Sequence, residues 1–225
     1  MILSHLDLKI MTTTKKTTTS KPKKARTVTV KKPVSLDLPK NPFMFEILDL
    51  ISKQRTKAKK IEVLKKYEEI SLKIILIWNF DESVISVLPP GEVPYTGYDD
   101  QNAYSGGVSG KISEEVRSMH AKGNFSLGVS DGQGHTTIRR ESKHFYRFIK
   151  GGDDGLNNLR RESMFINILE GLHPLEAEIV ILCKDKKLGD SYKITKDIVA
   201  EAYPDIKWGG RSWLRLFGLL KKKMD

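Results

Sequence analysis

Residues 71–80 read SLKIILIWNF, and this stretch decides the fold class. A helix built on it is apolar on nearly every side, whereas a half-exposed strand would alternate apolar and polar residues. A helix that is apolar all round is buried all round. We therefore predict that this segment forms the central helix of a helical core.

Two amphipathic helices are predicted before it. The stretch NPFMFEILDLISK, residues 41–53, offers Asn41 as an N-cap and Pro42 as the first helical residue. A second helix is expected from Thr56 to Tyr67, with most of its lysines facing outward. The run LPPGEVP, residues 88–94, then ends regular structure, because prolines remove backbone donors and restrict the residues before them.

Helical periodicity returns in the second half of the chain. One short helix is expected at Ser113–Ala121, inside a stretch rich in glycine. Four more periodic segments follow: ESKHFYRFIK (141–150), LNNLRRESMFINILEGL (156–172), PLEAEIVILCKDK (174–186) and TKDIVAEAYP (195–204), the last with Thr195 as its cap. With about seven helices and no convincing strand, the predicted fold class is all-α.

These elements divide the chain into five parts. We predict a disordered basic tail at 1–40, one helical domain in two parts at 41–94 and 140–208, a mobile glycine-rich insertion at 95–139, and an amphipathic C-terminal helix at 209–225. The tail contains TTTKKTTTSKPKKARTVTVKK, which has too few apolar groups to offset the entropy of ordering it. Met11 lies directly before this run and is a candidate start of the chain.

The positive charge is concentrated in the tail. Residues 1–40 hold ten Lys/Arg and two Asp/Glu, so they supply +8 of the formal net charge of +11. Such a segment is either an arm that gains affinity for nucleic acid by releasing counterions or a solubilising tail, and both interpretations stay open.

The sequence lacks the usual signatures of catalysis. It has no metal-ligand spacing of His or Cys, no phosphate-binding loop and no nucleophile elbow, so we expect no enzyme activity, catalytic residue, metal, cofactor or small-molecule substrate. The GGDDG run at 151–155 is interpreted as a solvated turn, and Cys183 as a buried reduced thiol. No apolar run is long enough for a membrane span, so no membrane partner is expected.

A group of lysines surrounds a glycine in KDKKLGDSYKIT, residues 184–195. Lysine charges, a glycine that permits close approach and hydroxyl or amide donors together suit a phosphate. An ordinary helix end, with cations near the C-terminal dipole and a glycine cap, explains the same pattern. The segment also resembles the end of the N-terminal all-helical DNA-binding domain of phage-type ATP-dependent DNA ligases. The matching residues are Lys184, Asp185 and Gly189, followed by Tyr203-Pro204-Asp205-Ile206, although the leucine that follows the Asp in ligases is displaced here.

The first helices resemble the same ligase domain. ILDLISKQRTKAKKIEVLKKYEEISLKIILIWNF, residues 47–80, is similar to its opening, in which a Ser/Thr-Lys turn and a lysine-rich helix lead to a third helix. The resemblance implies a helical domain that grips duplex DNA by its phosphates, with little sequence preference. The implied DNA-binding residues are Lys53, Arg55, Thr56, Lys57, Lys60, Lys184, Lys186, Lys187, Gly189, Ser191, Lys193, Thr195 and Lys196. The adenylated Lys-x-Asp-Gly tetrapeptide of ligases is absent, so we expect no ligase activity.

A second resemblance concerns origin. The blocks LPPGEVPY and FINILEGLHPLEAEIVILCKDK are similar to those of uncharacterised proteins encoded by large tailed phages, particularly marine ones. This resemblance implies a phage origin, and hence the cytoplasm of an infected bacterium, but no activity. Together with the ligase-like resemblance it leads us to expect a DNA-binding accessory protein of phage replication, repair or transcription. The alternative is a virion or assembly protein whose basic tail is a packaging arm.

The C-terminal stretch WGGRSWLRLFGLLKKKMD carries one apolar stripe: Trp213, Leu216, Phe217 and Leu220, at i, i+3, i+4 and i+7. The stripe either packs on the helical core or binds a partner, such as a replication sliding clamp.

Overall fold

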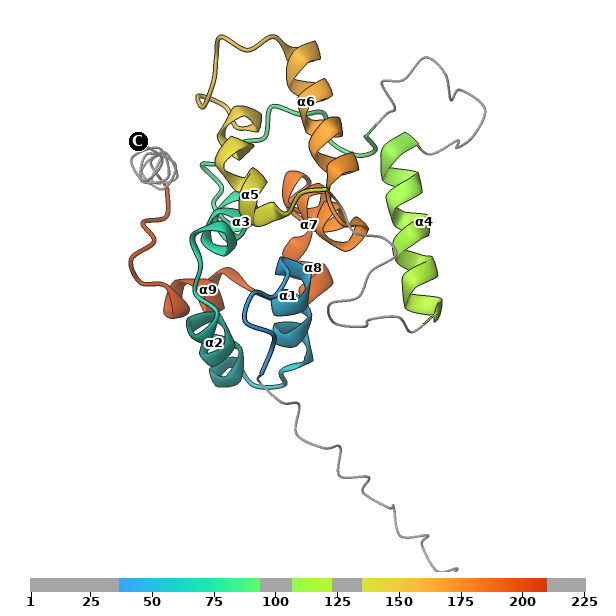
Figure 1. Ribbon diagram of the computed structural model, residues 1–225. Coiled ribbons are helices and arrows are strands. Elements are labelled where there is room, and N and C mark those ends of the chain that lie inside the picture. Colours follow the sequence, from blue (N-terminus) through green and yellow to red (C-terminus); the bar gives the residue numbers. More distant parts are fainter. Residues whose placement is uncertain (1–36, 94–106, 123–134, 210–225) are drawn as a thin grey trace, which may run out of the picture. The chain divides into compact units, whose positions relative to one another are not determined.

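The computed structural model describes residues 37–93, 107–122 and 135–209 (Figure 1). Within these ranges the fold is all-α, as predicted, and the only β interaction is an isolated bridge between Ser86 and Ile149. The helices are α1 (Met44–Lys53), α2 (Lys57–Lys66), α3 (Ile70–Phe80), α4 (Gly107–Lys122), α5 (Ile138–Glu141), the 3-10 helix η1 (Ser142–Phe148), α6 (Asn158–Gly171), α7 (Pro174–Lys184), α8 (Leu188–Tyr192) and α9 (Lys196–Ala202). None of them is long and apolar enough to cross a membrane.

Helix α3 is the buried centre, which confirms the prediction for residues 71–80. Every residue from Ser71 to Asn79 is buried, and α7, α8 and η1 pack against this helix. The Trp78 ring lies 5.3 Å from that of Phe145 and 6.4 Å from that of Phe148, between ring centroids. Burying each large apolar side chain stabilises the fold by about 1.5–3 kcal/mol, so α3 supplies much of the driving force for folding.

The start of α1 differs from the prediction. Phe43, not Asn41, is the N-cap, and its N–H donates to the Glu46 carboxylate at 2.9 Å. The Pro42 carbonyl accepts a hydrogen bond from Arg139, so Pro42 is held outside the helix. Helix α2 begins as expected, because the Thr56 hydroxyl accepts from the N–H three residues later.

One buried carboxylate joins three helices. Glu176, in the first turn of α7, accepts hydrogen bonds from the N–H of Met44 at 3.1 Å and of Ile138 at 2.9 Å. These are the first residues of α1 and α5, whose N–H groups have no partner within their own helices. Burial raises the pKa of Glu176, while the two hydrogen bonds act in the opposite direction. Glu176 therefore fixes the starts of α1 and α5 against that of α7.

The predicted insertion at 95–139 contains a core helix. Val108, Ile112 and Val116 recur at a spacing of four, are buried, and face α7 in helix α4, which is longer than the predicted Ser113–Ala121. Ile138 is also fully buried, so residue 139 is the wrong boundary for an insertion. The apolar periodicity outweighs the glycines that suggested mobility. Residues 95–106 and 123–134 of the insertion lie outside the described ranges.

The expected helix at 141–150 is α5 followed by the 3-10 helix η1. A tight turn follows, where a Cβ at Gly152 would lie 1.8 Å from the Tyr146 carbonyl oxygen, so only glycine fits. Asp154 accepts from the N–H of Gly151 at 3.2 Å. The GGDDG run is thus a hydrogen-bonded turn, as interpreted from the sequence.

Candidate nucleic-acid interface

The lysine turn, residues 184–189, is first a helix end. Lys186 has a φ of 60°, its N–H donates to the Cys183 carbonyl at 3.2 Å, and the Lys187 N–H donates to the Leu182 carbonyl at 2.8 Å. This pair of bonds is the Schellman motif that closes α7. The left-handed residue is Lys186, where glycine is the usual choice, and Gly189 does not cap this helix.

Lys184 faces the interior. Its ammonium donates to the carbonyls of Pro89 at 2.9 Å and Gly91 at 3.0 Å and to the Asp185 carboxylate at 2.6 Å, and its side chain is 1% exposed. The same carboxylate accepts from the Gly91 N–H at 3.2 Å. All three ammonium protons are used, so the prediction that Lys184 binds a phosphate is wrong.

Lys186 also donates to backbone carbonyls, although this residue is exposed, unlike Lys184. Its ammonium donates to the carbonyl of Trp78 and to that of Asp81 at 2.8 Å, at the C-terminal end of α3. Burial lowers the pKa of this ammonium. The carbonyls at a helix C-terminus carry partial negative charge, so Lys186 caps α3. This contact accounts for its position without a phosphate.

Gly189 permits close approach, but to the protein itself. A Cβ there would lie 2.9 Å from the Ile194 carbonyl oxygen and 3.0 Å from Cε1 of Phe80. Gly189 lies in α8, a helix that the sequence did not predict, and α8 begins where the Leu188 N–H donates to the Asn79 side chain at 3.1 Å. Packing of α8 against α3 therefore accounts for this glycine without a phosphate.

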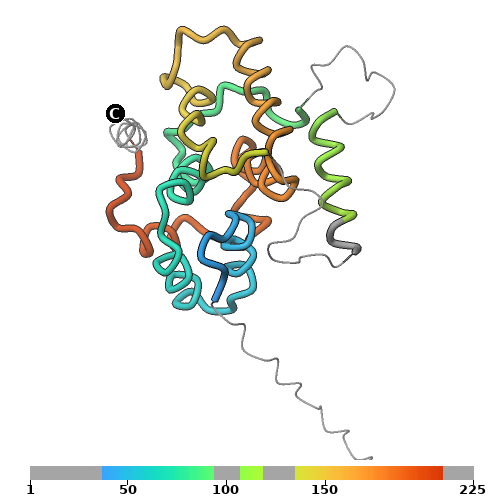
Figure 2. The backbone as a smooth tube through the Cα atoms, viewed as in Figure 1, coloured from blue at the N-terminus to red at the C-terminus, as the bar shows by residue number. Residues whose placement is uncertain are grey.

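The other predicted residues come together from two distant parts of the sequence. Helices α2 and α9 lie side by side (Figure 2). The Lys60 ammonium donates to the Lys193 carbonyl, at the left-handed residue that ends α8. Burial, followed by the neighbouring charge of Lys193, lowers the pKa of Lys60. Neither lysine has a carboxylate partner in the part of the chain that the structure describes.

We define the basic junction as Lys60 and Lys193 together with three exposed residues of the predicted set at the starts of α2 and α9: Arg55, Lys57 and Lys196. Lys57 pairs with Glu201 at 2.7 Å, and both side chains are more than half exposed. The Lys196 ammonium lies 5.3 Å from the centroid of the Trp208 ring. Exposed pairs of this kind contribute little and exchange readily, so these cations remain available to a ligand.

Four of the remaining predicted residues lie around the basic junction. Lys53 pairs with Asp49 at 2.6 Å, and the Thr56 hydroxyl is used to cap α2. Ser191 and Thr195 are exposed, and the Thr195 side chain makes no capping hydrogen bond although this residue is the N-cap of α9. Lys187, on the lysine turn, is exposed as well and remains a candidate.

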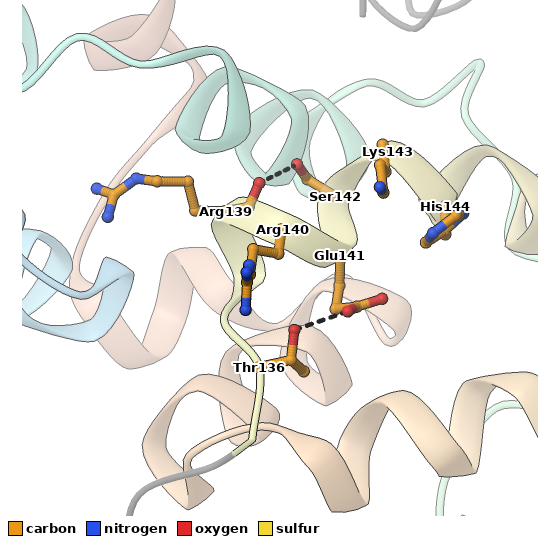
Figure 3. Close-up of a pocket in the computed structure, with 7 residues that line it drawn as sticks. All are labelled: Thr136, Arg139, Arg140, Glu141, Ser142, Lys143 and His144. Atoms are coloured by element: carbon orange, nitrogen blue, oxygen red, sulfur yellow. Dashed lines mark hydrogen bonds between the residues drawn. The ribbon is translucent and has the colours of Figure 1, made fainter. Parts of the chain in front are cut away.

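The side chains of a second basic surface do not point toward a common site. An open pocket of about 520 Å³ is lined by Thr136, Arg139, Arg140, Glu141, Ser142, Lys143 and His144. Arg139 is held by the Glu69 carboxylate at 2.5 and 2.7 Å. Figure 3 shows that the side chains of Arg139, Arg140, Lys143 and His144 point in different directions. These groups do not surround one point, so the pocket is not our candidate site.

Metal and thiol chemistry find no support in the described ranges. No group of three or more His, Cys, Asp or Glu side chains there could hold a metal ion. Cys183 is fully buried, as predicted, with Sγ 3.7 Å from the Ile75 carbonyl oxygen, and burial raises the pKa of its thiol.

The sequence analysis missed two buried carboxylates. Asp81 accepts from the Ser83 N–H at 2.9 Å and hydroxyl at 2.7 Å, and from the Gly209 N–H at 3.1 Å. The spacing of Asp81 and Ser83 is typical of an Asx turn and could have indicated the first two bonds. Glu176 gave no comparable signal, because acidic residues are common in the first turn of any helix.

Comparison with known protein families identifies one family whose model matches this chain. The model described as "Family of unknown function (DUF6433)" matches residues 47–124 and 113–190, which together span more than half of the sequence. The chain belongs to this family. The part matched by DUF6433 contains Lys57 and Lys60 but ends before Lys193 and Lys196. No curated protein and no solved structure matches the chain.

Proposed function

We propose that this DUF6433 member is a non-catalytic accessory protein that binds duplex DNA through the basic junction with little sequence preference. Its place would be in phage DNA replication, repair or transcription, as the two sequence resemblances imply. The proposal keeps the turn after α1 and the α8–α9 connection as the DNA-binding segments. It leaves out Lys184, Lys186 and Gly189, which the fold uses internally.

The contact between Lys60 and Lys193 carries the proposal. Segments separated by more than a hundred residues meet where the Lys60 ammonium donates to the Lys193 backbone carbonyl, and the charge of Lys193 is near enough to add to the effect of burial in lowering the Lys60 pKa. No ion pair with a carboxylate joins either lysine among the described residues. Like charges held together cost free energy, which a bound anion offsets. A nucleic-acid backbone offers closely spaced phosphates, and neutralising them releases counterions.

The chemistry of the basic junction favours affinity over sequence readout. Its members are four lysines and one arginine, on two connecting turns and the first turns of α2 and α9. Contacts of lysines with phosphates position a protein without reading bases. We therefore expect similar affinity for unrelated duplexes.

The basic tail joins the domain next to the same helix. Asp37 pairs with Lys66 at 2.6 Å, and the Leu38 N–H donates to the Tyr67 hydroxyl at 2.7 Å, both at the end of α2. Residues 37 and 38 therefore contact the domain, and the predicted tail boundary at residue 40 is too late. Residues 1–36, which lie outside the described ranges, hold nine Lys/Arg and one Asp. As an arm they would add sequence-independent affinity.

Two charge-matched triple variants test the proposal. The first changes Arg55, Lys60 and Lys196 to Gln, and the control changes Arg140, Lys143 and Lys150 to Gln, on α5, η1 and the residues that follow. Both remove one arginine and two lysines. Binding of the full chain to two unrelated duplexes is measured by fluorescence anisotropy over a range of salt concentrations.

The junction variant should lose affinity for both duplexes and should lower the slope of log K against log salt by about 0.9 for each lost phosphate contact. The control should behave as the wild type does. Equal losses in the two variants would mean that only net charge matters and would reject the junction. Absence of DNA binding, with stoichiometric recovery of the protein from purified virions, would favour the assembly alternative.

A further inference from the structure

An apolar ridge lies on the segment after α3. Ile85 is 53% and Val87 37% exposed, and Pro89 is exposed as well, whereas Val84 and Leu88 are buried. The alternation is that of an extended chain with one face inward. We call Ile85, Val87 and Pro89 the apolar ridge.

The ridge is fixed to the core. The Val87 N–H donates to the Phe148 carbonyl at 2.9 Å, and the Lys150 N–H donates to the Ile85 carbonyl at 2.9 Å. These bonds hold the segment against the end of η1. The exposed side chains of the ridge therefore lie on a segment that is held in place by backbone hydrogen bonds. A surface fixed in this way suits the binding of another apolar segment.

The described structure ends at a residue that is tied to the start of the segment carrying this ridge. Gly209 is the last described residue, and its N–H donates to the Asp81 carboxylate at 3.1 Å. Asp81 is four residues before Ile85. Trp213 is four residues after Gly209, so an extended connection lets it reach about 13 Å from that hydrogen bond.

The sequence beyond Gly209 carries an apolar stripe. Its stripe, Trp213, Leu216, Phe217 and Leu220, lies outside the described ranges and is known here by its spacing alone. The stripe begins four residues after Gly209, and the ridge begins four residues after Asp81. These two residues are joined by a hydrogen bond. This short tether gives the stripe a millimolar effective concentration at the ridge, which favours it over a separate protein or a second copy.

We propose that the C-terminal stripe of the same chain covers the apolar ridge. The C-terminal residues then complete the core and are not an anchor for a sliding clamp. This inference does not depend on DNA binding, because it rests only on the ridge, the bond between Gly209 and Asp81, and the spacing of the stripe.

Cross-linking in the full chain tests the proposal. The test variant carries Val87→Cys and Leu216→Cys, and the matched control carries Val87→Cys and Arg215→Cys, a position off the stripe. Cys183 is fully buried and will not compete for a short bismaleimide. The test pair should cross-link within one chain at a yield that is independent of protein concentration, and the control pair should react poorly. Equal yields from the two pairs, or cross-links only between chains, would overturn the proposal.

A double-mutant cycle provides a second measurement if the cysteine variants are uninformative. Val87→Asp and Leu216→Asp should each lower the melting temperature of the full chain, because each places a carboxylate in the same apolar contact. Together they should lower it by clearly less than the sum of the single effects. Additive shifts, or no shift for Leu216→Asp, would show that the two residues do not meet.

Discussion

Replacing Lys184 by Met separates the two roles that a lysine near this turn can have. Methionine has a similar length and packs well in apolar surroundings, but it lacks the ammonium. The change removes three hydrogen bonds, of 2.9, 3.0 and 2.6 Å, and leaves the Asp185 carboxylate with an 11% exposed side chain and without its cation. If Lys184 serves as an internal clasp, that is, if its hydrogen bonds hold the turn at 89–91 against the end of α7, the variant should lose stability.

The expected loss can be worked from these contacts. Removing one partner of a buried ion pair costs about 3–5 kcal/mol. Pro89 and Gly91 belong to an exposed turn, so water can replace the ammonium at their carbonyls. We therefore expect the lower end, about 3 kcal/mol, which corresponds to a fall in melting temperature of about 6–12 °C for a domain of this size.

Urea denaturation followed by circular dichroism measures this loss, with Lys187→Met as the control. Lys187 lies three residues away and is exposed, so its replacement should leave the free energy of unfolding nearly unchanged. Folded Lys184→Met protein should retain the affinity of the wild type for duplex DNA. Full stability together with lost DNA affinity would refute the clasp and restore the phosphate assignment that the sequence suggested.

Three further substitutions test the fold and its pH dependence. Glu176→Ala leaves two buried N–H groups without an acceptor and should lower the free energy of unfolding by about 2–5 kcal/mol in urea titrations; an unchanged midpoint would contradict the double cap. Gly189→Ala should be destabilising in the same assay because its Cβ would meet a backbone oxygen at 2.9 Å, whereas Gly155→Ala, with nothing nearer than 3.9 Å, should be tolerated. His173 caps α7 through Nδ1, and burial lowers its pKa below the usual 6.5. Its contribution is therefore present above pH 6.5 and is lost as the pH falls through the folded-state pKa, because the imidazolium cannot accept the bond. His173→Asn keeps a capping acceptor and should remove this part of the acid sensitivity; identical pH profiles for variant and wild type would reject it.

Much of the fold could be predicted because periodicity and capping are local signals. The apolar residues of α3 and the starts of α2, α7 and α9 follow from neighbours in the sequence. The length of α4 was underestimated because its glycines raise the entropic cost of ordering the backbone, and this cost is visible in the sequence. The gain from burying Val108, Ile112 and Val116 is not visible there, because it depends on α7, far along the chain. Helix α8 was missed for a related reason, since Asn79 fixes its start.

The site was harder to predict because a lysine has the same appearance in sequence whether it faces solvent or a carbonyl. Lys184 is buried and Lys186 is bonded to the end of α3 only because the turn at 89–91 and the end of α3 lie beside the lysine turn. No local pattern indicates that arrangement. The contact of Lys60 with Lys193 is equally non-local, and it joins two segments that the sequence could single out but not bring together.

Lysine footprinting tests the basic junction most directly. The full chain is treated with an amine-acetylating reagent at low salt, with and without duplex DNA, and acetylation at each lysine is quantified by mass spectrometry. Bound duplex should protect Lys60, Lys193 and Lys196, should leave Lys143 and Lys150 reactive, and should not change Lys184, which is buried in either state. Equal protection of Lys143 and Lys150, or no protection of the junction lysines in a saturated complex, would contradict the account.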